Sequence, residues 1–264
     1  MGRKERAEER RKQRQQEISL FRTIPYSDHQ RWWNSETIVV VTGANRGIGF
    51  EIARQLCGHG LTVILTSRDS AIGREAASVL QEGGFNAVSH QLDVLDPSSI
   101  EQFAEWVQQN YGFVDILINN AGVNYNMGSE NSVENAENVI ATNYFGTKIG
   151  QLEDVDSLSE EVIDQMVHTF VEQVKDGTWT SAGWPQTFTD YSVSKLAVNC
   201  YTRIMAKVLS DRPEGEKIFI NCYCPGWVKT AMTGWAGNVS VEEGADTGVW
   251  LALLPDQSVT GKFC

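Results

Sequence analysis

The sequence predicts an α/β protein in which a Rossmann-like, doubly wound parallel sheet forms a single domain. Three observations lead to this prediction. Apolar, β-branched runs of strand length alternate with amphipathic segments of helical length, a glycine-rich turn follows the first run, and no linker divides the chain. The alternation implies right-handed βαβ units, because parallel neighbours need a helical crossover between them.

Length, composition and charge favour one globular domain behind a charged extension. The 264 residues suffice for a single large core, and 41% of them are hydrophobic. The net charge is −12, yet residues 1–17 carry seven basic and four acidic groups. Such a segment is either a solvated helix or tail, or a localisation or membrane-surface signal. We expect an extension over residues 1–36, packed from residue 18 onward, and a domain over 37–264 whose acidic character argues against nucleic acid.

Cysteine, histidine and hydropathy patterns argue against several classes of protein. The five cysteines are odd in number and form no Cys-x-x-Cys pair, which favours free thiols in a reducing compartment. The four histidines are scattered, so no metal site is predicted. No apolar stretch reaches the roughly 18 residues that span a bilayer, and no signal peptide is expected. The sequence thus predicts a cytoplasmic protein without a membrane partner.

The first half of the domain alternates strands and helices at regular spacing. The β-branched run at 37–42 is typical of a strand buried on both faces. Asp96 and Pro97 mark a helix start, because Asp caps the first amides and Pro fits the first turn. The pattern predicts strands at 37–42, 62–66, 87–92 and 115–118, and helices at 47–56, 71–80 and 96–110.

The second half is less regular. A helix follows Asn131 and ends near Gly150. Residues 151–190 form an inserted segment that holds one amphipathic helix and a polar loop containing tryptophan. The predicted elements here are helices at 158–174, 191–209 and 241–254, and a strand at 217–222.

A glycine-rich turn, TGANRGIG, joins the first strand to the first helix, with glycines spaced G-x-x-x-G-x-G. Glycines let the backbone approach a pyrophosphate, whose charge is stabilised by free amides and by the helix dipole. We therefore predict a dinucleotide site at this turn, with binding residues Thr42, Gly43, Asn45, Arg46, Gly47, Ile48 and Gly49.

The residues after the second strand bear on the choice between NAD and NADP. An acidic group there binds the ribose hydroxyls of NAD, whereas an arginine accommodates a 2′-phosphate. The chain has Arg68 at this point and Arg46 inside the glycine turn, so two guanidinium groups would meet the phosphate. This favours NADP(H). In the alternative, both arginines are surface residues and Asp69 is the ribose ligand.

Two further strand ends fall where a nucleotide would lie, because ligands of open α/β sheets bind at the carboxyl ends of the strands. Asp93 and Val94 follow the third strand, and Asn120, Ala121 and Gly122 follow the fourth. Each segment is either a cofactor contact or a plain turn.

Tyr191 and Lys195 stand four residues apart in YSVSK, which places them on one face of a helix. A phenol with a pKa near 10 is a poor proton donor or acceptor at neutral pH until a nearby cation stabilises its phenolate. Lys195 is the candidate cation, although Tyr-x-x-x-Lys also occurs by chance.

In this order the motifs resemble those of the short-chain dehydrogenase/reductase family: TGANRGIG, Asp93-Val94, NNAG, Asn143 in the next helix, YSVSK and PGWVKT. The resemblance runs from about residue 37 to 262. The segment before Tyr191, with GWP (183–185) and VEEGA (241–245), is similar to the plant monomeric branch that includes carbonyl reductases, salutaridine reductase and neomenthol dehydrogenase. In that branch the extra segment covers the face through which related enzymes tetramerise, which implies a monomer.

The resemblance implies an NADP(H)-dependent oxidoreductase acting on a carbonyl or secondary alcohol of a small apolar metabolite. Tyr191 would be the general acid, Lys195 would lower its pKa and hold the nicotinamide ribose, and Asn143 would position a water in the proton relay. The nicotinamide end would be contacted by Pro225, Gly226, Val228 and Thr230. The tryptophans either line an apolar substrate pocket or belong to ordinary packing: Trp184, Trp227 and Trp235.

The sequence departs from the family pattern between Asn143 and Tyr191. The family has there an internal fifth strand that ends in a Ser polarising the substrate carbonyl, whereas residues 148–151 lead directly into the inserted segment. The fourth strand and the strand at 217–222 must then pair, which would shift the Tyr191 helix by about 5 Å, or leave their edges open. The alternative function is a catalytically impaired, nucleotide-binding splice or truncated form of such an enzyme.

Overall fold

The computed structural model describes residues 31–125, 132–147, 159–184, 188–254 and 259–264. Within them, a parallel sheet of order β3-β2-β1-β4 and seven α-helices form the predicted Rossmann-like α/β fold. The strands are β1 (Ile38–Val41), β2 (Thr62–Ser67), β3 (Ala87–Gln91) and β4 (Ile116–Ile118). The charged segment 1–17 and the junction at 148–151 lie outside the described residues.

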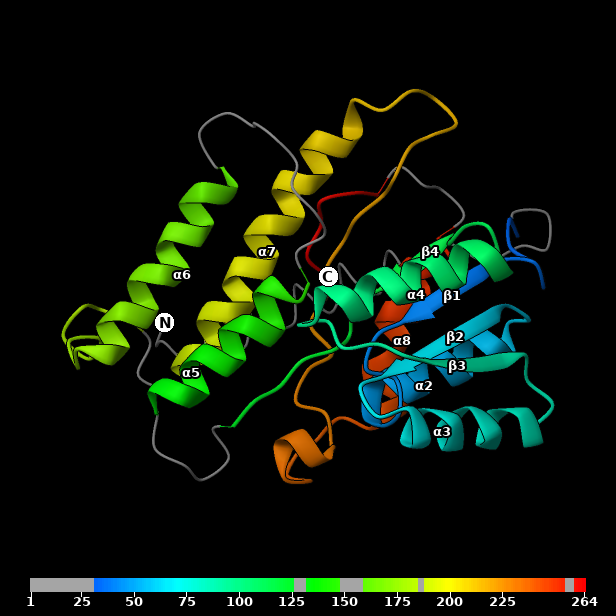
Figure 1. Ribbon diagram of the computed structural model, residues 1–264, viewed down its shortest axis with the longest axis horizontal. Helices are drawn as coiled ribbons and strands as arrows, with labels where there is room; N and C mark the ends of the chain where they lie inside the picture. The colour runs from blue at the N-terminus through cyan, green and yellow to red at the C-terminus, as the bar shows by residue number, and fades with distance from the viewer. Residues whose placement is uncertain (1–30, 126–131, 148–158, 185–187, 255–258) are drawn as a thin grey trace, which may run out of the picture.

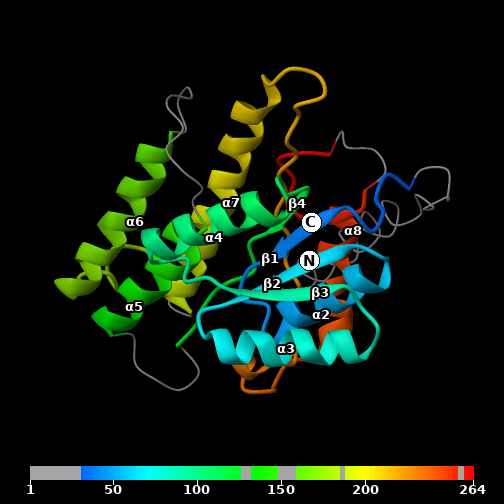
Figure 2. The ribbon, with the colours of Figure 1, turned by 45° about the vertical axis from the view of Figure 1, so that its right-hand side comes forward.

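Helices α2 (Gly47–Gly58), α3 (Ser70–Glu82) and α8 (Val241–Ala252) share one core with the sheet (Figures 1 and 2). Alternate side chains of β1 and β2 point to this face, because successive residues of a strand face opposite sides. Val39 and Val63, which are paired in register, are fully buried there. They belong to one cluster with Ile52 of α2 and Leu253 at the end of α8.

Helix α4 (Pro97–Asn110) covers the opposite face of the sheet. Its start is the one that the sequence predicts, since the Asp96 carboxylate accepts the Ser98 amide at 3.0 Å and Pro97 is the first helical residue. Phe103 of α4 packs with Val40 and with other side chains of this face. The two faces of β1 are thus buried under different helices, as its unbroken apolar run predicts.

Helices α5 (Val133–Ile140), α6 (Glu160–Lys175) and α7 (Thr189–Ser210) pack on one another beside the sheet (Figures 1 and 2). One turn of π-helix, η2 (Ala141–Phe145), continues α5. A separate apolar cluster holds these helices together and includes Tyr144, Val167, Phe170 and Tyr201. The buried Tyr144 hydroxyl donates to Asp164 of α6 at 2.8 Å. The inserted segment 151–190 therefore contributes α6 as the outer helix of this group.

The predicted strand at residues 217–222 is wrong. Cys222 forms only an isolated parallel bridge with Phe263, and Ile218 and Phe219 are exposed. Among the described residues β4 hydrogen-bonds to β1 alone, so its outer edge stays open and Leu117 is 46% exposed. An apolar segment forms a strand only when a neighbouring strand accepts and donates its backbone hydrogen bonds. Among the described residues, the only such neighbour of this segment is the single bridge to Phe263.

Residues 31–36 form the described part of the N-terminal extension, and all of them except Trp33 are exposed. Trp33 is buried, and its indole nitrogen donates to the carbonyl of His59 at 3.3 Å. The Trp32 indole donates to the carbonyl of Leu254 at 3.2 Å. Across the part of the chain that the structure describes, every helix is too short or too polar to cross a membrane.

Candidate active site

The glycine turn between β1 and α2 has the backbone geometry that only glycine adopts freely. Gly43 and Gly47 have φ values of 61° and 60°. A Cβ atom on Gly43 would lie 3.0 Å from the Cα of Ala121, so a larger residue would displace the turn after β4. Among the described residues no side chain caps α2 at Arg46, which leaves its first amides facing the turn. The turn can therefore accept an anionic group through backbone donors.

Thr42 and Asn120 tie the turn after β4 to the glycine turn. The Asn120 amide nitrogen donates to the carbonyls of Thr42 at 2.9 Å and of Gly43 at 3.1 Å. In return the Thr42 hydroxyl accepts the backbone N–H of Ala121 at 3.0 Å. Two strand ends that the sequence singled out separately thus form one unit. The half-buried residues Asn45 and Ile48 complete the loop.

The two candidate phosphate-binding arginines, Arg46 and Arg68, are both exposed at the carboxyl edge of the sheet. Asp69, the alternative ribose ligand, caps a helix instead. Its carboxylate accepts the amides of Ala71 at 2.8 Å and Ile72 at 3.1 Å and so caps α3. A carboxylate engaged in this way is poorly placed to bind ribose hydroxyls, which favours the interpretation in which the arginines meet a phosphate.

Asp93 and Val94 form the turn after β3. The Asp93 amide donates to the Ser99 hydroxyl at 2.9 Å, and its carboxylate accepts the Leu95 amide at 3.0 Å. The Val94 side chain lies against Gly146, the residue that follows η2, because a Cβ atom on Gly146 would lie 2.8 Å from it. These hydrogen bonds hold the turn in place at the carboxyl edge of the sheet, beside η2, which carries Asn143.

Asn143 and Lys195 meet at the turn after β4, and Lys195 lies beside Tyr191. A Cβ atom on Gly122 would lie 3.1 Å from the Asn143 carbonyl oxygen and 3.7 Å from the Lys195 Nζ atom. The same Nζ atom lies 5.5 Å from the centre of the Tyr191 ring. Helix spacing explains the last contact, since residues four apart share a face. The structure therefore brings Asn143 to Lys195 and Lys195 to Tyr191.

Asn143 is fully buried within η2. Its side-chain oxygen accepts the Val123 amide at 2.7 Å, and its Nδ2 atom donates to the Val123 carbonyl at 2.9 Å. The side chain thereby replaces a strand neighbour for the backbone just after β4. Single π turns are frequent at functional sites, but the sequence carries no pattern that identified this one.

Burial sets the ionisation of the pair on α7. It raises the pKa of the Tyr191 phenol, and the nearby Cys224 thiol raises it further, whereas the resemblance implies a pKa that Lys195 lowers. Burial lowers the pKa of the Lys195 ammonium group, which Cys224 partly offsets. Sequence reasoning missed Cys224 as a neighbour of both residues. Its only sequence signal is its place directly before Pro225.

Residues 225–230 reach back to the glycine turn. Gly226 has a φ of 83°. The buried Val228 packs closely on Gly244 of α8, because a Cβ atom on Gly244 would lie only 2.6 Å from the Val228 side chain. The Thr230 methyl group is 3.8 Å from the Cβ position of Gly47. The segment thus lies over the start of α2, on the same side as the other predicted cofactor contacts.

The three candidate pocket tryptophans do not lie together. Trp184 packs against Phe170 of α6 at 5.2 Å between ring centres and donates to Gln173 at 2.6 Å. It belongs to the core between the helices. Trp227 and Trp235 are 42% and 62% exposed. The Trp227 ring stands 6.2 Å from that of Phe188, which directly precedes α7.

Comparisons with known proteins agree with this arrangement. A family profile described as "short chain dehydrogenase" matches residues 37–238. The chain is 36% identical over 261 residues to Carbonyl reductase [NADPH] 1 of Bos taurus, with 85% of this chain and 94% of that protein covered. It is 38% identical over 277 residues to (+)-neomenthol dehydrogenase of Arabidopsis thaliana, with coverage of 83% and 92%. The structure of salutaridine reductase from Papaver somniferum superposes with a TM-score of 0.76 at 32% identity, covering 86% of this chain and 99% of that one.

Proposed function

We propose that this chain, which belongs to the short-chain dehydrogenase family, transfers hydride between NADP(H) and a carbonyl or secondary alcohol carbon of a small apolar metabolite. The observation that carries the proposal is that Asn143 and Lys195 meet at Gly122, next to the glycine turn, and that Lys195 lies beside the Tyr191 ring. A proton donor, a cation and a nucleotide-binding turn are the parts that this chemistry needs.

The cofactor site suits a dinucleotide phosphate. The positive φ angles of Gly43 and Gly47 and the uncapped start of α2 fit a pyrophosphate, and exposed Arg46 and Arg68 fit a 2′-phosphate. When bound, NADPH supplies the hydride. In this proposal the remaining contacts come from Thr42, Asn45, Ile48, Gly49, Asp93, Val94, Asn120, Ala121, Gly122, Pro225, Gly226, Val228 and Thr230.

Tyr191 is the proton donor in this scheme. Burial raises the pKa of the phenol, so it is protonated at neutral pH, and it needs the Lys195 cation to stabilise its phenolate when its proton passes to the substrate oxygen. Lys195 holds the nicotinamide ribose and stabilises the phenolate that remains. Asn143 orients the turn after β4 and a water in the proton relay. Trp227 offers the substrate an exposed apolar surface beside Phe188, the residue that precedes α7.

We further propose a monomeric, cytoplasmic enzyme. Helix α6 packs on α5 and α7 and would occupy the face through which related enzymes associate. No disulfide joins the five cysteines, all of which lie within the described residues, and this favours a reducing compartment. Sedimentation equilibrium at several protein concentrations tests the first point, since a single species of 29.4 kDa is expected.

Thermal unfolding with and without excess NADPH, followed by a ketone screen, tests the proposed function. A ligand that binds only the folded chain raises the unfolding temperature. We expect such a rise, and NADPH oxidation that Tyr191→Phe lowers by about 10²- to 10⁴-fold without lowering NADPH affinity. A rise without turnover on any ketone would favour the alternative of an impaired nucleotide-binding form. A broad transition that NADPH does not move would contradict both.

A further inference from the structure

Ser194 links the first turn of α7 to Asn143. It is fully buried, and its hydroxyl donates to the Tyr191 backbone carbonyl at 2.8 Å. The same oxygen accepts a hydrogen bond from the Asn143 Nδ2 atom at 3.1 Å. Asn143 in turn holds the Val123 backbone with both of its side-chain polar atoms. A continuous polar chain therefore runs from the turn after β4 to Tyr191.

This chain of contacts matters because of where α7 stands. Within the described ranges the helix packs on α5, α6 and η2 rather than on strands, and β4 pairs with β1 alone. Apolar packing with its neighbouring helices fixes α7 within that group but not against the end of β4. Asn143 of η2 bonds to Val123 just after β4 and to Ser194 of α7, so it joins the two parts through directional contacts, and Lys195, the residue after Ser194, lies beside Gly122.

We propose that Ser194 is a positioning residue that keeps Tyr191 and Lys195 in place against Asn143 and the turn after β4. This inference rests on the proposed function. It assigns Ser194 no contact with substrate or cofactor. Loss of its hydroxyl leaves the buried Asn143 amide with one acceptor fewer and lets the first turn of α7 move, and displacements near 1 Å already cost rate.

Thr202 provides a matched control on the same helix. It is buried, and its hydroxyl donates to the Val198 carbonyl at 2.9 Å, a back-bond similar to that of Ser194. It lies two turns beyond the segment that meets Asn143. Ser194→Ala and Thr202→Val each remove one buried hydroxyl from α7, so both should lower the unfolding temperature to a similar extent.

Competitive acylation of lysines, read by mass spectrometry, tests positioning without any need for turnover. Lys195 is half-buried with its Nζ atom beside Gly122, whereas Lys207 on the same helix is exposed and serves as the internal reference. We expect Ser194→Ala to raise the labelling rate of Lys195 relative to Lys207 by at least threefold, and Thr202→Val to leave it within 1.5-fold. An unchanged Lys195 rate in Ser194→Ala would overturn the proposal, whatever the chain's activity.

Kinetics then separate positioning from general destabilisation. With a ketone that the wild-type chain reduces, Ser194→Ala should lower kcat by about tenfold and leave the KM for NADPH within about twofold. Thr202→Val should change neither. Equal kcat losses in the two variants would overturn the proposal. If the wild-type chain reduced no ketone, or if its turnover survived Tyr191→Phe, the proposed function would be contradicted instead. The labelling result would still decide the role of Ser194.

Discussion

A Cβ atom on Gly49 would stand 2.3 Å from the side-chain nitrogen of Asn120. Helix α2 and the turn after β4 therefore approach each other through a glycine, and the Asn120 amide is fully used by the carbonyls of Thr42 and Gly43. The second glycine of the G-x-G pair thus has a packing role. It makes room for the contact that joins two strand ends into one site.

Gly49→Ala should destabilise the chain by about 1–3 kcal/mol, because the methyl group must displace Asn120. NADPH binding should weaken with it. Gly58→Ala is the control in the same helix, since a Cβ atom there meets nothing within 4 Å, and its effect should be neutral or slightly stabilising. Urea unfolding of both variants checks this. Equal stability of the two would contradict the close approach.

Arg68→Ala should lower the preference for NADPH over NADH by about tenfold, because it removes a charge-assisted contact to the 2′-phosphate. The effect is no larger because Arg68 is exposed, and water weakens the binding energy of the contact. Dissociation constants for both nucleotides, measured by fluorescence titration, give the ratio. Arg74→Ala, which removes an exposed arginine from α3, should leave the ratio unchanged. An unchanged ratio in Arg68→Ala would make Arg68 an ordinary surface residue.

Asp69→Ala should lower stability by about 1 kcal/mol and leave the ratio of NADPH to NADH affinity as it is. The carboxylate caps α3 through the Ala71 and Ile72 amides, and loss of such a cap typically costs this much. Thermal unfolding and the same nucleotide titrations check both parts. A selective loss of NADH affinity would support the alternative in which Asp69 binds the ribose.

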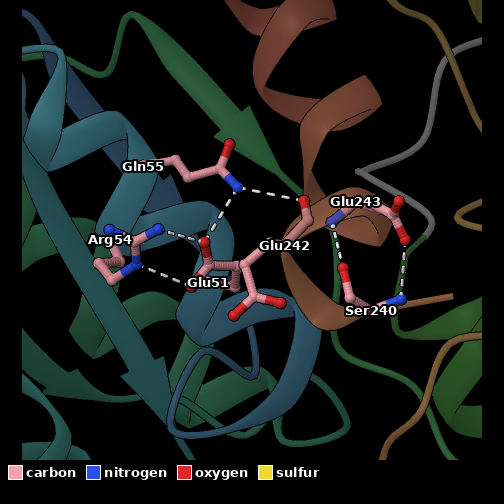
Figure 3. A network of polar contacts seen from close by, with 6 residues as sticks. All are labelled: Glu51, Arg54, Gln55, Ser240, Glu242 and Glu243. Carbon is pink, nitrogen blue, oxygen red and sulfur yellow. Dashed lines mark hydrogen bonds and ion pairs between the residues drawn. The ribbon is translucent and has the colours of Figure 1, made fainter.

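Glu51 should make stability depend on pH below about 5. Figure 3 shows its buried carboxylate among Arg54, Gln55 and α8; Arg54 Nη2 lies 2.6 Å away, and Gln55 also donates to the Glu242 carbonyl. Burial alone would raise the pKa of Glu51, but hydrogen bonds from Arg54 and Gln55 and the Arg54 charge outweigh it and lower the pKa. A carboxyl with a lowered folded-state pKa stabilises the fold above its ordinary pKa, and this contribution disappears as pH falls through the folded-state value.

Glu51→Gln should therefore destabilise the chain at pH 7 by about 1 kcal/mol, a modest value because Arg54 is half exposed and can turn to water. The difference from wild type should shrink toward pH 3. Glu75→Gln, which removes an exposed carboxylate from α3, should show no such trend. Urea unfolding at pH 3, 4, 5 and 7 checks the prediction, and a constant difference across this range would contradict it.

Local patterns predicted the first half of the fold almost to the residue. Helix α4 begins at Pro97 behind its Asp96 cap, and α2 begins at Gly47 directly after the glycine turn. These signals depend on neighbours within one turn of chain, such as caps, positive φ angles and the period of apolar residues. The same reasoning failed at 217–222, where the apolar pattern was present but the described part of the chain offers only an isolated bridge from Cys222 to Phe263.

The sequence by itself determined the family, the order of strands and helices and the residue types of the candidate site. Only the tertiary structure decided that Asn143 and Lys195 meet at Gly122 and that Ser194 joins them. It also decided that Trp184 lies in the helical core and that, among the residues described, β4 pairs with β1 alone. The physical reason is that the spacing of residues in a motif reflects contacts within one helix, strand or turn. Contacts between elements depend instead on how apolar faces are buried and how backbone groups find hydrogen-bond partners across the whole chain.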